Sequence, residues 1–332
     1  MPLDLKKSLQ FDEAAEVRRI SETMRAVLRE HVRRRGLVVA MSGGIDSSVC
    51  AGLSVAAIGR ERVFGLLLPE RDSSTDSGRR GRLLADHLGI ECISVDIAPA
   101  LEALGCYGWR DEAIRATFPE FGDGWKSKII IDGGAQGRVN FYKLVVRSPA
   151  GETMSKRLDP KHYLQIVAAT NFKQRVRKTL EYFHADRLNY AVVGTPNRLE
   201  YDQGFFVKNG DGSADVKPIA HLYKSQVYAL ARHLGLPPDI CAASPTTDTY
   251  SLAQGQDEFY FALPYAQMDM ALLAKNNGIS AADAAPQLNL SEEQVEFVYK
   301  DIDSKRRATG VLHWPGITIE QVSGPVPPPK LG

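Results

Sequence analysis

The sequence predicts an α/β fold in which a doubly wound, mostly parallel sheet is flanked by helices. Three short apolar runs, at 37–41, 62–68 and 91–95, have the length and composition of buried parallel strands. Helical patterns separate them, at about 48–59 and 76–88. Strand–helix–strand repetition at this spacing is typical of a doubly wound sheet. Such sheets bind ligands at the carboxyl ends of their strands.

Composition indicates one cytoplasmic domain spanning residues 1–332. Hydrophobic residues make up 44% of the chain and charged residues 24%, which is ordinary for a globular protein, and the net charge is +1. A chain so close to neutral gives no reason to expect nucleic acid or an anionic membrane as a partner. The four cysteines form no CxxC pair, which fits a reducing cytoplasm, and no leader-like or 18-residue apolar stretch is present.

The rest of the pattern adds helices, one more strand and an insertion. Helical periodicity covers 12–35, resumes at about Tyr163 and returns in several pieces from Lys224 to about Arg307, and an apolar strand is expected at 190–193. Between 104 and 162 glycines interrupt the pattern with turns. There, 141–147 and 152–158 form a predicted β-hairpin. We expect 104–162 to be an insertion on the α/β core, as a lid or as decoration, and 324–332 to be a frayed, Pro-rich tail.

The loop after the first strand, Ser42–Ser48 (SGGIDSS), has the composition of an anion site. Gly43 and Gly44 allow backbone N–H groups to approach an oxyanion, the following helix end adds about half a positive charge, and the serine hydroxyls can donate further hydrogen bonds. The loop has no Lys, which a Walker-type phosphate loop requires. Asp46 stands there instead, and a carboxylate beside phosphates is best explained as a Mg²⁺ ligand.

This loop resembles the pyrophosphate loop of the N-type ATP pyrophosphatases, which have an adenine nucleotide alpha hydrolase-like fold and cleave ATP to AMP and pyrophosphate. Four further segments sharpen the resemblance: 195–200 (TPNRLE), 204–218, Lys224 at a helix start, and 245–248 (PTTD). Alone, each is explained by a turn, a cap or a surface charge. In this order and spacing they resemble the synthetase domain of NAD⁺ synthetases, over roughly 15–100 and 163–310.

The resemblance implies the roles of individual residues. Contacts with ATP are implied for Ser42, Gly43, Gly44, Ser47, Ser48, Thr195, Lys224 and Thr246. Binding of Mg²⁺ is implied for Asp46 and Glu200, with Thr246 near the metal. Contacts with nicotinic acid adenine dinucleotide are implied for Asn171, Arg175, Lys208, Asp211, Asp215, Lys305 and Arg306, although Ser304 stands where the family often has His.

The implied reaction is an ATP-dependent amidation. The substrate carboxylate attacks the α-phosphorus of ATP, giving an acyl adenylate and pyrophosphate, and ammonia then displaces AMP. Positioning and electrostatics carry such chemistry, so Asp46 with its cation and Lys224 are the expected catalytic groups, and no nucleophilic Ser or Cys is needed. Asp215 is a hypothetical acceptor of the ammonium proton.

Several alternatives stay open from the sequence. Ammonia is the expected nitrogen donor because the chain has no room for a glutaminase domain and residue 2 is Pro rather than a catalytic Cys, but a separate glutaminase would also supply ammonia. The chain could instead amidate another carboxylate, modify tRNA or bind nucleotides without turnover; the near-neutral charge disfavours the tRNA enzymes. The family expectation is a homodimer with the dinucleotide near the interface, and the 12–35 helix is a candidate contact.

Overall fold

The computed structural model describes residues 3–132, 141–243, 250–252, 255, 260–261 and 263–320. Four parallel strands form the central sheet, in the order β3 (Glu91–Ser94), β2 (Val63–Leu67), β1 (Leu37–Ala40) and β7 (Ala191–Val192). The chain builds the sheet outward from β1 to β3 and then returns to the other side of β1 with β7. The predicted doubly wound class is confirmed, and the strand order reverses between β1 and β7, where such sheets bind ligands.

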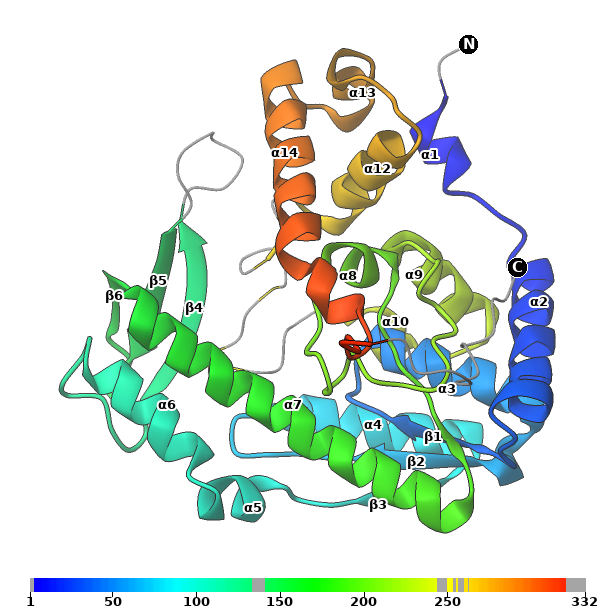
Figure 1. The fold of residues 1–332 in the computed structure, drawn as a ribbon, viewed down its shortest axis with the longest axis horizontal. Coiled ribbons are helices and arrows are strands. Elements are labelled where there is room, and N and C mark those ends of the chain that lie inside the picture. The colour runs from blue at the N-terminus through cyan, green and yellow to red at the C-terminus, as the bar shows by residue number, and fades with distance from the viewer. Residues whose placement is uncertain are drawn as a thin grey trace.

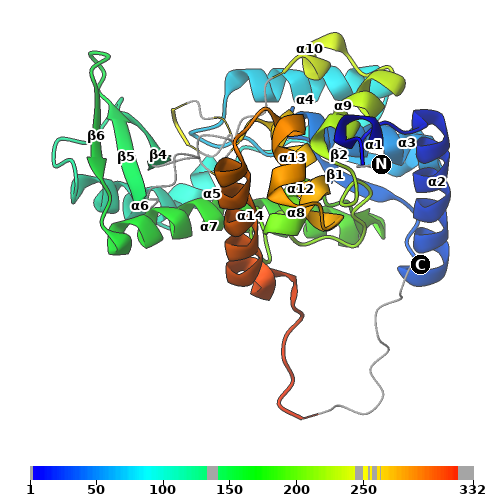
Figure 2. The same cartoon turned by 90° about the horizontal axis from the view of Figure 1, so that it is seen from above.

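Helices cover both faces of this sheet. On one side lie α2 (Glu13–Ala26), α3 (Ile45–Ile58), α4 (Thr75–Leu88) and α9 (Lys224–His233), and on the other lies the long α7 (Pro160–Leu188). Figure 2 shows the layers from above, with α4 and α7 on opposite sides of the strands. The helix expected at 12–35 is present as α2, and it continues into a π-helical turn, η1 (Val27–His31).

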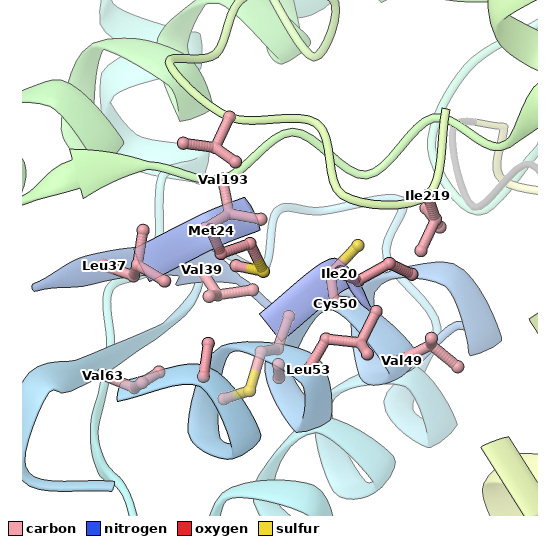
Figure 3. Close-up of a cluster of buried hydrophobic side chains, with 14 of the residues drawn as sticks. Ile20, Met24, Leu37, Val39, Val49, Cys50, Leu53, Val63, Val193 and Ile219 are labelled. Atoms are coloured by element: carbon pink, nitrogen blue, oxygen red, sulfur yellow. The ribbon is translucent and has the colours of Figure 1, made fainter. Parts of the chain in front are cut away.

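The core on the α2–α3 side is aliphatic (Figure 3). Leu37 and Val39 of β1 are completely buried there, whereas Val38 between them packs on the α7 side, as expected of alternating side chains on a strand. Ile20 and Met24 of α2 close the same cluster. Because the strand is buried on both faces, its sequence is a continuous apolar run rather than an alternating one.

The expected hairpin is present and belongs to a larger sheet. Its strands are β5 (Phe141–Arg147) and β6 (Thr153–Arg157), and a third strand that we did not anticipate, β4 (Lys126–Asp132), pairs antiparallel with β5. Figure 1 shows this sheet standing at one end of α7. Its inner face, with Ile129 and Leu144, packs on residues of α6 and α7 in a separate hydrophobic cluster.

Two helices precede this sheet, α5 (Ala98–Ala103) and α6 (Cys106–Arg115), where the glycines had suggested turns. That expectation was wrong for α6. Gly105 has a φ of +82° and begins the helix, and Gly108 lies within it with no heavy atom within 4 Å of the position a Cβ would take. Glycine on an open helix face costs about 1 kcal/mol, which the buried side of α6 offsets.

The C-terminal helices form a second body of the domain, upright in Figure 1. They are α12 (Tyr265–Asn276), α13 (Ala281–Leu288) and α14 (Glu292–Thr309), followed by a 3₁₀ turn, η4 (Gly310–His313). Shorter elements complete the chain: α1 (Leu5–Ser8), η2 (Arg60–Arg62), α8 (Arg198–Gln203) and α10 (Pro238–Cys241). The Pro-rich segment 324–332 lies outside the described residues. Over the part of the chain that is described, no helix is both long and apolar enough to cross a membrane.

Candidate active site

The loop between β1 and α3 has the backbone of an anion site. Gly43 has a φ of +76°, and a Cβ there would lie 2.4 Å from the carbonyl oxygen of Ser77, so this position accepts only glycine. The chain then enters α3, a helix of 14 residues capped by Gly44. The first N–H groups of α3 therefore point toward the ends of β1 and β2 with no partner inside the helix.

The serine hydroxyls of the loop have different surroundings. Ser42 and Ser47 line the cavity beside the loop, and their hydroxyls lie 3.2 Å apart. Ser48 is completely buried and donates to the carbonyl oxygen of Gly44 at 2.8 Å. Ser47 donates to the same carbonyl oxygen at 3.0 Å, so Ser47 and Ser48 both support the loop, while Ser42 and Ser47 also border the cavity.

The loop opens into a cavity of about 480 Å³ at the carboxyl edge of β1, β2 and β7. Its walls come from the anion loop, from 66–69 at the end of β2, from 193–196 after β7, and from α7. Ten of the sequence-predicted residues line it: Ser42, Gly43, Gly44, Asp46, Ser47, Asn171, Thr195, Glu200, Asp211 and Lys224. Thr246, like all of 245–248, lies outside the described residues.

A compact charged cluster lies at the β1–β7 side of the cavity. The ammonium of Lys224 is paired with the carboxylate of Asp46, and Lys224 is only 1% exposed. The side-chain amide of Asn197 donates to Oδ1 of Asp46 at 3.2 Å. Glu200 follows in the first turn of α8, where its Oε2 accepts the backbone N–H of Asn197 at 3.2 Å. These bonds hold three sequence-distant charges at the end of two strands.

Buried Asp269 fixes the start of α9 beneath this cluster. Its two carboxylate oxygens accept the backbone N–H groups of Lys224 at 3.1 Å and Ser225 at 2.7 Å. Burial raises the pKa of Asp269 to about 6, although these hydrogen bonds oppose the rise. Sequence reasoning did not find Asp269, since it lies 45 residues from Lys224 on a helix of the C-terminal body.

The cluster has two carboxyl groups for one ammonium. Burial, followed by the nearby carboxylate of Asp46, raises the pKa of Glu200 to about 8. Burial disfavours the ammonium of Lys224, but Asp46 and Glu200 outweigh it and raise the pKa of Lys224. Among the described residues no group of three or more His, Cys, Asp or Glu side chains could hold a metal by itself. Two carboxylates facing a phosphate-binding loop suit a hard cation that takes its other ligands from phosphate and water.

The α7 wall of the cavity bears polar residues that the sequence analysis missed. Gln174, Lys178 and Glu181 line the cavity with Asn171, at helical spacings of three and four. Lys178 and Glu181 are 5% and 4% exposed, and their charged atoms lie 2.6 Å apart. Asp211 lies near them, and burial raises the pKa of its carboxyl and that of Glu181. The spacing from Asn171 was a signal in the sequence that could have identified this stripe.

The outer end of the cavity is aromatic. Tyr142 of β5 and Tyr163 of α7 both line it, with their rings stacked at a centroid distance of 4.0 Å and an interplanar angle of 16°. Burial raises the pKa of Tyr163, so its hydroxyl is neutral. The 104–162 segment thus supplies part of the cavity wall.

Five of the predicted substrate residues lie outside the cavity, and three of them, Arg175, Lys208 and Asp215, lie beside α7. Arg175 is exposed, and its Nε donates to the carbonyl oxygen of Lys208 at 3.3 Å. The Nζ of Lys208 in turn donates to the carbonyl oxygen of Val311 at 2.9 Å. Asp215 is also exposed; its Oδ2 accepts the backbone N–H of Val192 at 2.8 Å, and the hydroxyl of Tyr182 lies 3.4 Å from its Oδ1. These residues lie together beside the outward face of α7.

The predicted basic pair on α14 is engaged in internal contacts. Lys305 donates to Oδ2 of Asp301 and to the carbonyl oxygen of Tyr260, both at 2.5 Å. Arg306 donates to both carboxylate oxygens of Asp202, at 2.6 and 2.9 Å. Neither side chain lines the cavity, but Tyr260 does. The contact of Arg306 attaches α14 to α8, and that of Lys305 attaches it to Tyr260.

Comparison with known proteins assigns this site to a family. The NAD synthase family profile matches residues 16–116 and 141–308. The chain is 57% identical over 307 residues to the NH(3)-dependent NAD(+) synthetase of Rhizobium meliloti, with 92% of each chain covered, and 56% identical to that of Mesorhizobium japonicum, with 92% of this chain and 96% of the relative covered.

Solved structures agree on the fold. An NMN synthetase from Francisella tularensis superimposes with a TM-score of 0.64 at 22% identity, covering 93% of this chain and 99% of the other. An NH3-dependent NAD synthetase from Campylobacter jejuni superimposes with a TM-score of 0.61 at 20% identity, covering 93% of this chain and all of the other. With the profile match over most of its length and relatives above 50% identity, the chain belongs to the NAD synthase family.

Proposed function

We propose that this protein is an ATP-dependent ligase that converts nicotinic acid adenine dinucleotide and ammonia to NAD⁺, releasing AMP and pyrophosphate. Its relatives of more than 50% identity carry the name NH(3)-dependent NAD(+) synthetase and match it over nearly their whole length. The observation that carries the proposal is the convergence of a lysine-free anion loop, two carboxylates and the buried Lys224 at the switch point of the sheet.

The first step joins the substrate carboxylate to the α-phosphorus of ATP and expels pyrophosphate. Negative charge grows on the phosphoryl oxygens as this step proceeds. The N–H groups at the start of α3, the hydroxyls of Ser42 and Ser47, and the ammonium of Lys224 are preorganised donors for those oxygens. Since the cavity is walled by α7 and the loops, little water competes for these donors.

We also propose that Asp46 and Glu200 bind Mg²⁺. Both carboxyl groups line the cavity next to the anion loop, and the raised pKa of Glu200 reflects how unfavourable a second negative charge beside Asp46 is without a cation. Bound there, Mg²⁺ would neutralise phosphate charge and favour pyrophosphate as a leaving group. The assignment of Thr246 near this metal stays a prediction from the resemblance.

In the second step ammonia attacks the acyl adenylate, and the attacking nitrogen must lose a proton. The hypothesis that Asp215 takes this proton gains no support from its position, because its carboxylate is exposed and bonded to the N–H of Val192. Asp211 and Glu181 line the cavity, and burial raises the pKa of each, which makes each carboxylate a better proton acceptor than an exposed one.

We propose that the dinucleotide extends from the cavity to the exposed residues beside α7 and that a second copy of the chain completes its site. Arg175 and Asp215 are exposed on that outer face, and Lys208 beside Arg175 is half-buried. Leu164 and Phe183 of α7 are 64% and 58% exposed there, which favours α7 over the charged outer face of α2 as the homodimer contact. A cytoplasmic location, suggested by the scattered cysteines, also stays a proposal.

One assay tests the reaction. The purified chain is mixed with ATP, Mg²⁺, ammonium and nicotinic acid adenine dinucleotide, and NAD⁺, AMP and pyrophosphate are separated by chromatography. Equal amounts of the three products, lost in Asp46→Ala, are expected. Pyrophosphate released only with another carboxylate would assign the chain to a paralogous substrate, and turnover only with glutamine and a cell extract would indicate a separate glutaminase.

A further inference from the structure

A second cluster of buried charges lies beside the cavity, behind the loop that follows β2. At its centre is Lys173 of α7, whose Nζ lies 3.1 Å from Oε1 of Glu70 and 2.6 Å from Oδ2 of Asp72. Arg110 of α6 also pairs with Asp72, and the hydroxyl of Tyr107 donates to Oε2 of Glu70 at 2.8 Å. Lys173 is 1% exposed and Glu70 is 6% exposed, so these bonds form away from water.

Stability alone does not explain such a cluster. A buried ion pair adds little over apolar side chains of the same volume, because desolvation of both charges offsets their attraction. The cluster does fix the position of the loop 69–74. Both carboxylates belong to the loop 69–74, and the cations come from two different helices, so the loop is held from two sides.

The cavity side of the same loop is held by another residue of α7. Arg177, one helical turn after Lys173, donates from Nε to the carbonyl oxygen of Leu68 at 3.1 Å and from Nη2 to Oγ of Ser73 at 3.3 Å. Leu68, Pro69 and Ser73 all line the cavity. Lys173 thus contacts the side of the loop that faces away from the cavity, and the other side of the same loop forms one wall of the site.

This wall lies on the nucleoside side of the site. The charges that suit a polyphosphate, Asp46, Glu200 and Lys224, lie on the β1–β7 side of the anion loop. On the β2 side, the lining from Leu66 to Pro69 is apolar, which suits a purine base. ATP with its phosphates on the anion loop therefore directs its nucleoside toward the loop that Lys173 holds.

We propose that Lys173 is a positioning residue for ATP, which acts by holding the loop 69–73, through Glu70 and Asp72, at the separation from α7 that the nucleoside requires. The proposal rests on the proposed function, because that function puts ATP in this cavity. Nothing in the reaction chemistry requires Lys173 itself, since its ammonium is enclosed behind the loop.

The test is a comparison of Michaelis constants in Lys173→Met, which removes the charge and keeps the length. We expect the KM for ATP to rise at least tenfold, while kcat and the KM values for ammonium and the dinucleotide stay within twofold. Lys173→Arg, which keeps the charge, should restore most of the affinity for ATP. The double variant Lys173→Met/Glu70→Gln restores charge balance without the contact, so its melting temperature should recover while its KM for ATP stays high.

Val298→Ala is the matched control for lost stability, because Val298 is completely buried in the cluster of C-terminal helices, away from the cavity. A lower melting temperature in Lys173→Met with a KM for ATP within twofold of wild type would overturn the proposal. If Lys173→Met does not fold, Glu70→Gln replaces the charged contact of Lys173 with a neutral one, and a KM for ATP that does not rise in this milder variant has the same consequence. If the wild type makes no NAD⁺, the proposed function fails, but calorimetric ATP binding to wild type and Lys173→Met still decides the inference.

Discussion

Substitution of Glu200 by Gln should stabilise the metal-free protein and abolish most of its activity. The carboxyl of Glu200 is 9% exposed, and burial with the nearby Asp46 raises its pKa from 4.5 to about 8. Its accepted bond from the N–H of Asn197 can pass to the amide oxygen of Gln. The substitution thus removes a charge that the folded state disfavours and keeps the helix cap.

The magnitude follows from the difference in pKa. A group whose pKa is higher in the folded state stabilises the fold fully below its unfolded pKa, here 4.5, and loses that contribution as the pH rises through about 8. At about 1.4 kcal/mol per pKa unit, the loss is about 3 kcal/mol at pH 7 and about 5 kcal/mol above pH 8. Gln does not titrate, so the stability of Glu200→Gln should not show this loss.

The assay is thermal unfolding of both proteins in EDTA between pH 5 and 9. The melting temperature of the variant should exceed that of wild type by roughly 6 °C at pH 7, at about 2 °C per kcal/mol for a large domain, and the gap should close toward pH 5. Mg²⁺ should raise the melting temperature of wild type more than that of the variant, because one proposed ligand is lost. Parallel pH profiles for the two proteins in EDTA would refute the reasoning.

Three further substitutions test other parts of the site. Lys224→Met removes a preorganised cation from the phosphates and should lower kcat about 100- to 1,000-fold in a pyrophosphate-release assay; a loss below tenfold contradicts its role. Gly43→Ala forces a Cβ to within 2.4 Å of the carbonyl oxygen of Ser77, so it should lower the free energy of unfolding by more than about 2 kcal/mol, measured by thermal unfolding. Gly44→Ala should lower it less, because the only atom near its Cβ among the described residues is Oγ of Ser42, at 3.3 Å. Arg175→Ala should raise the KM for the dinucleotide about tenfold and leave that for ATP within twofold; equal effects on both would contradict an outer dinucleotide site.

The central part of the site could be predicted from the sequence because its residues follow one another along the chain. One strand, seven loop residues and one helix make the anion site, and their backbone conformation follows from glycine and helix-end chemistry. Glu200 and Lys224 could be added because each lies at the start of a helix in the expected order. Asp269 and Tyr142 could not be predicted, because they reach the site through the tertiary packing of distant segments. No local sequence pattern indicates such packing.

Helical geometry also explains why two residues of one predicted group lie in different surroundings. Asn171 and Arg175 are four residues apart and belong to one sequence pattern, yet Asn171 lines the cavity and Arg175 is exposed. A step of four residues advances an α-helix by about 6 Å and rotates the side-chain direction by about 40°, which suffices to pass from the cavity wall to its rim. The sequence pattern alone could not show which of the two side chains lines the cavity and which is exposed.

The charge balance of the buried clusters separates structural from ligand-binding roles. In the cluster behind the 69–74 loop, Lys173 and Arg110 match Glu70 and Asp72, whereas Lys178 is paired with Glu181 and has the buried carboxyl of Asp211 near it as well. The cluster behind the loop needs no ligand, since each buried charge already has its counterpart. At the switch point, by contrast, Asp46 and Glu200 face the one ammonium of Lys224, and the raised pKa of Glu200 records the imbalance. We therefore expect the metal at the switch point, where two carboxyl groups share one ammonium beside the anion loop.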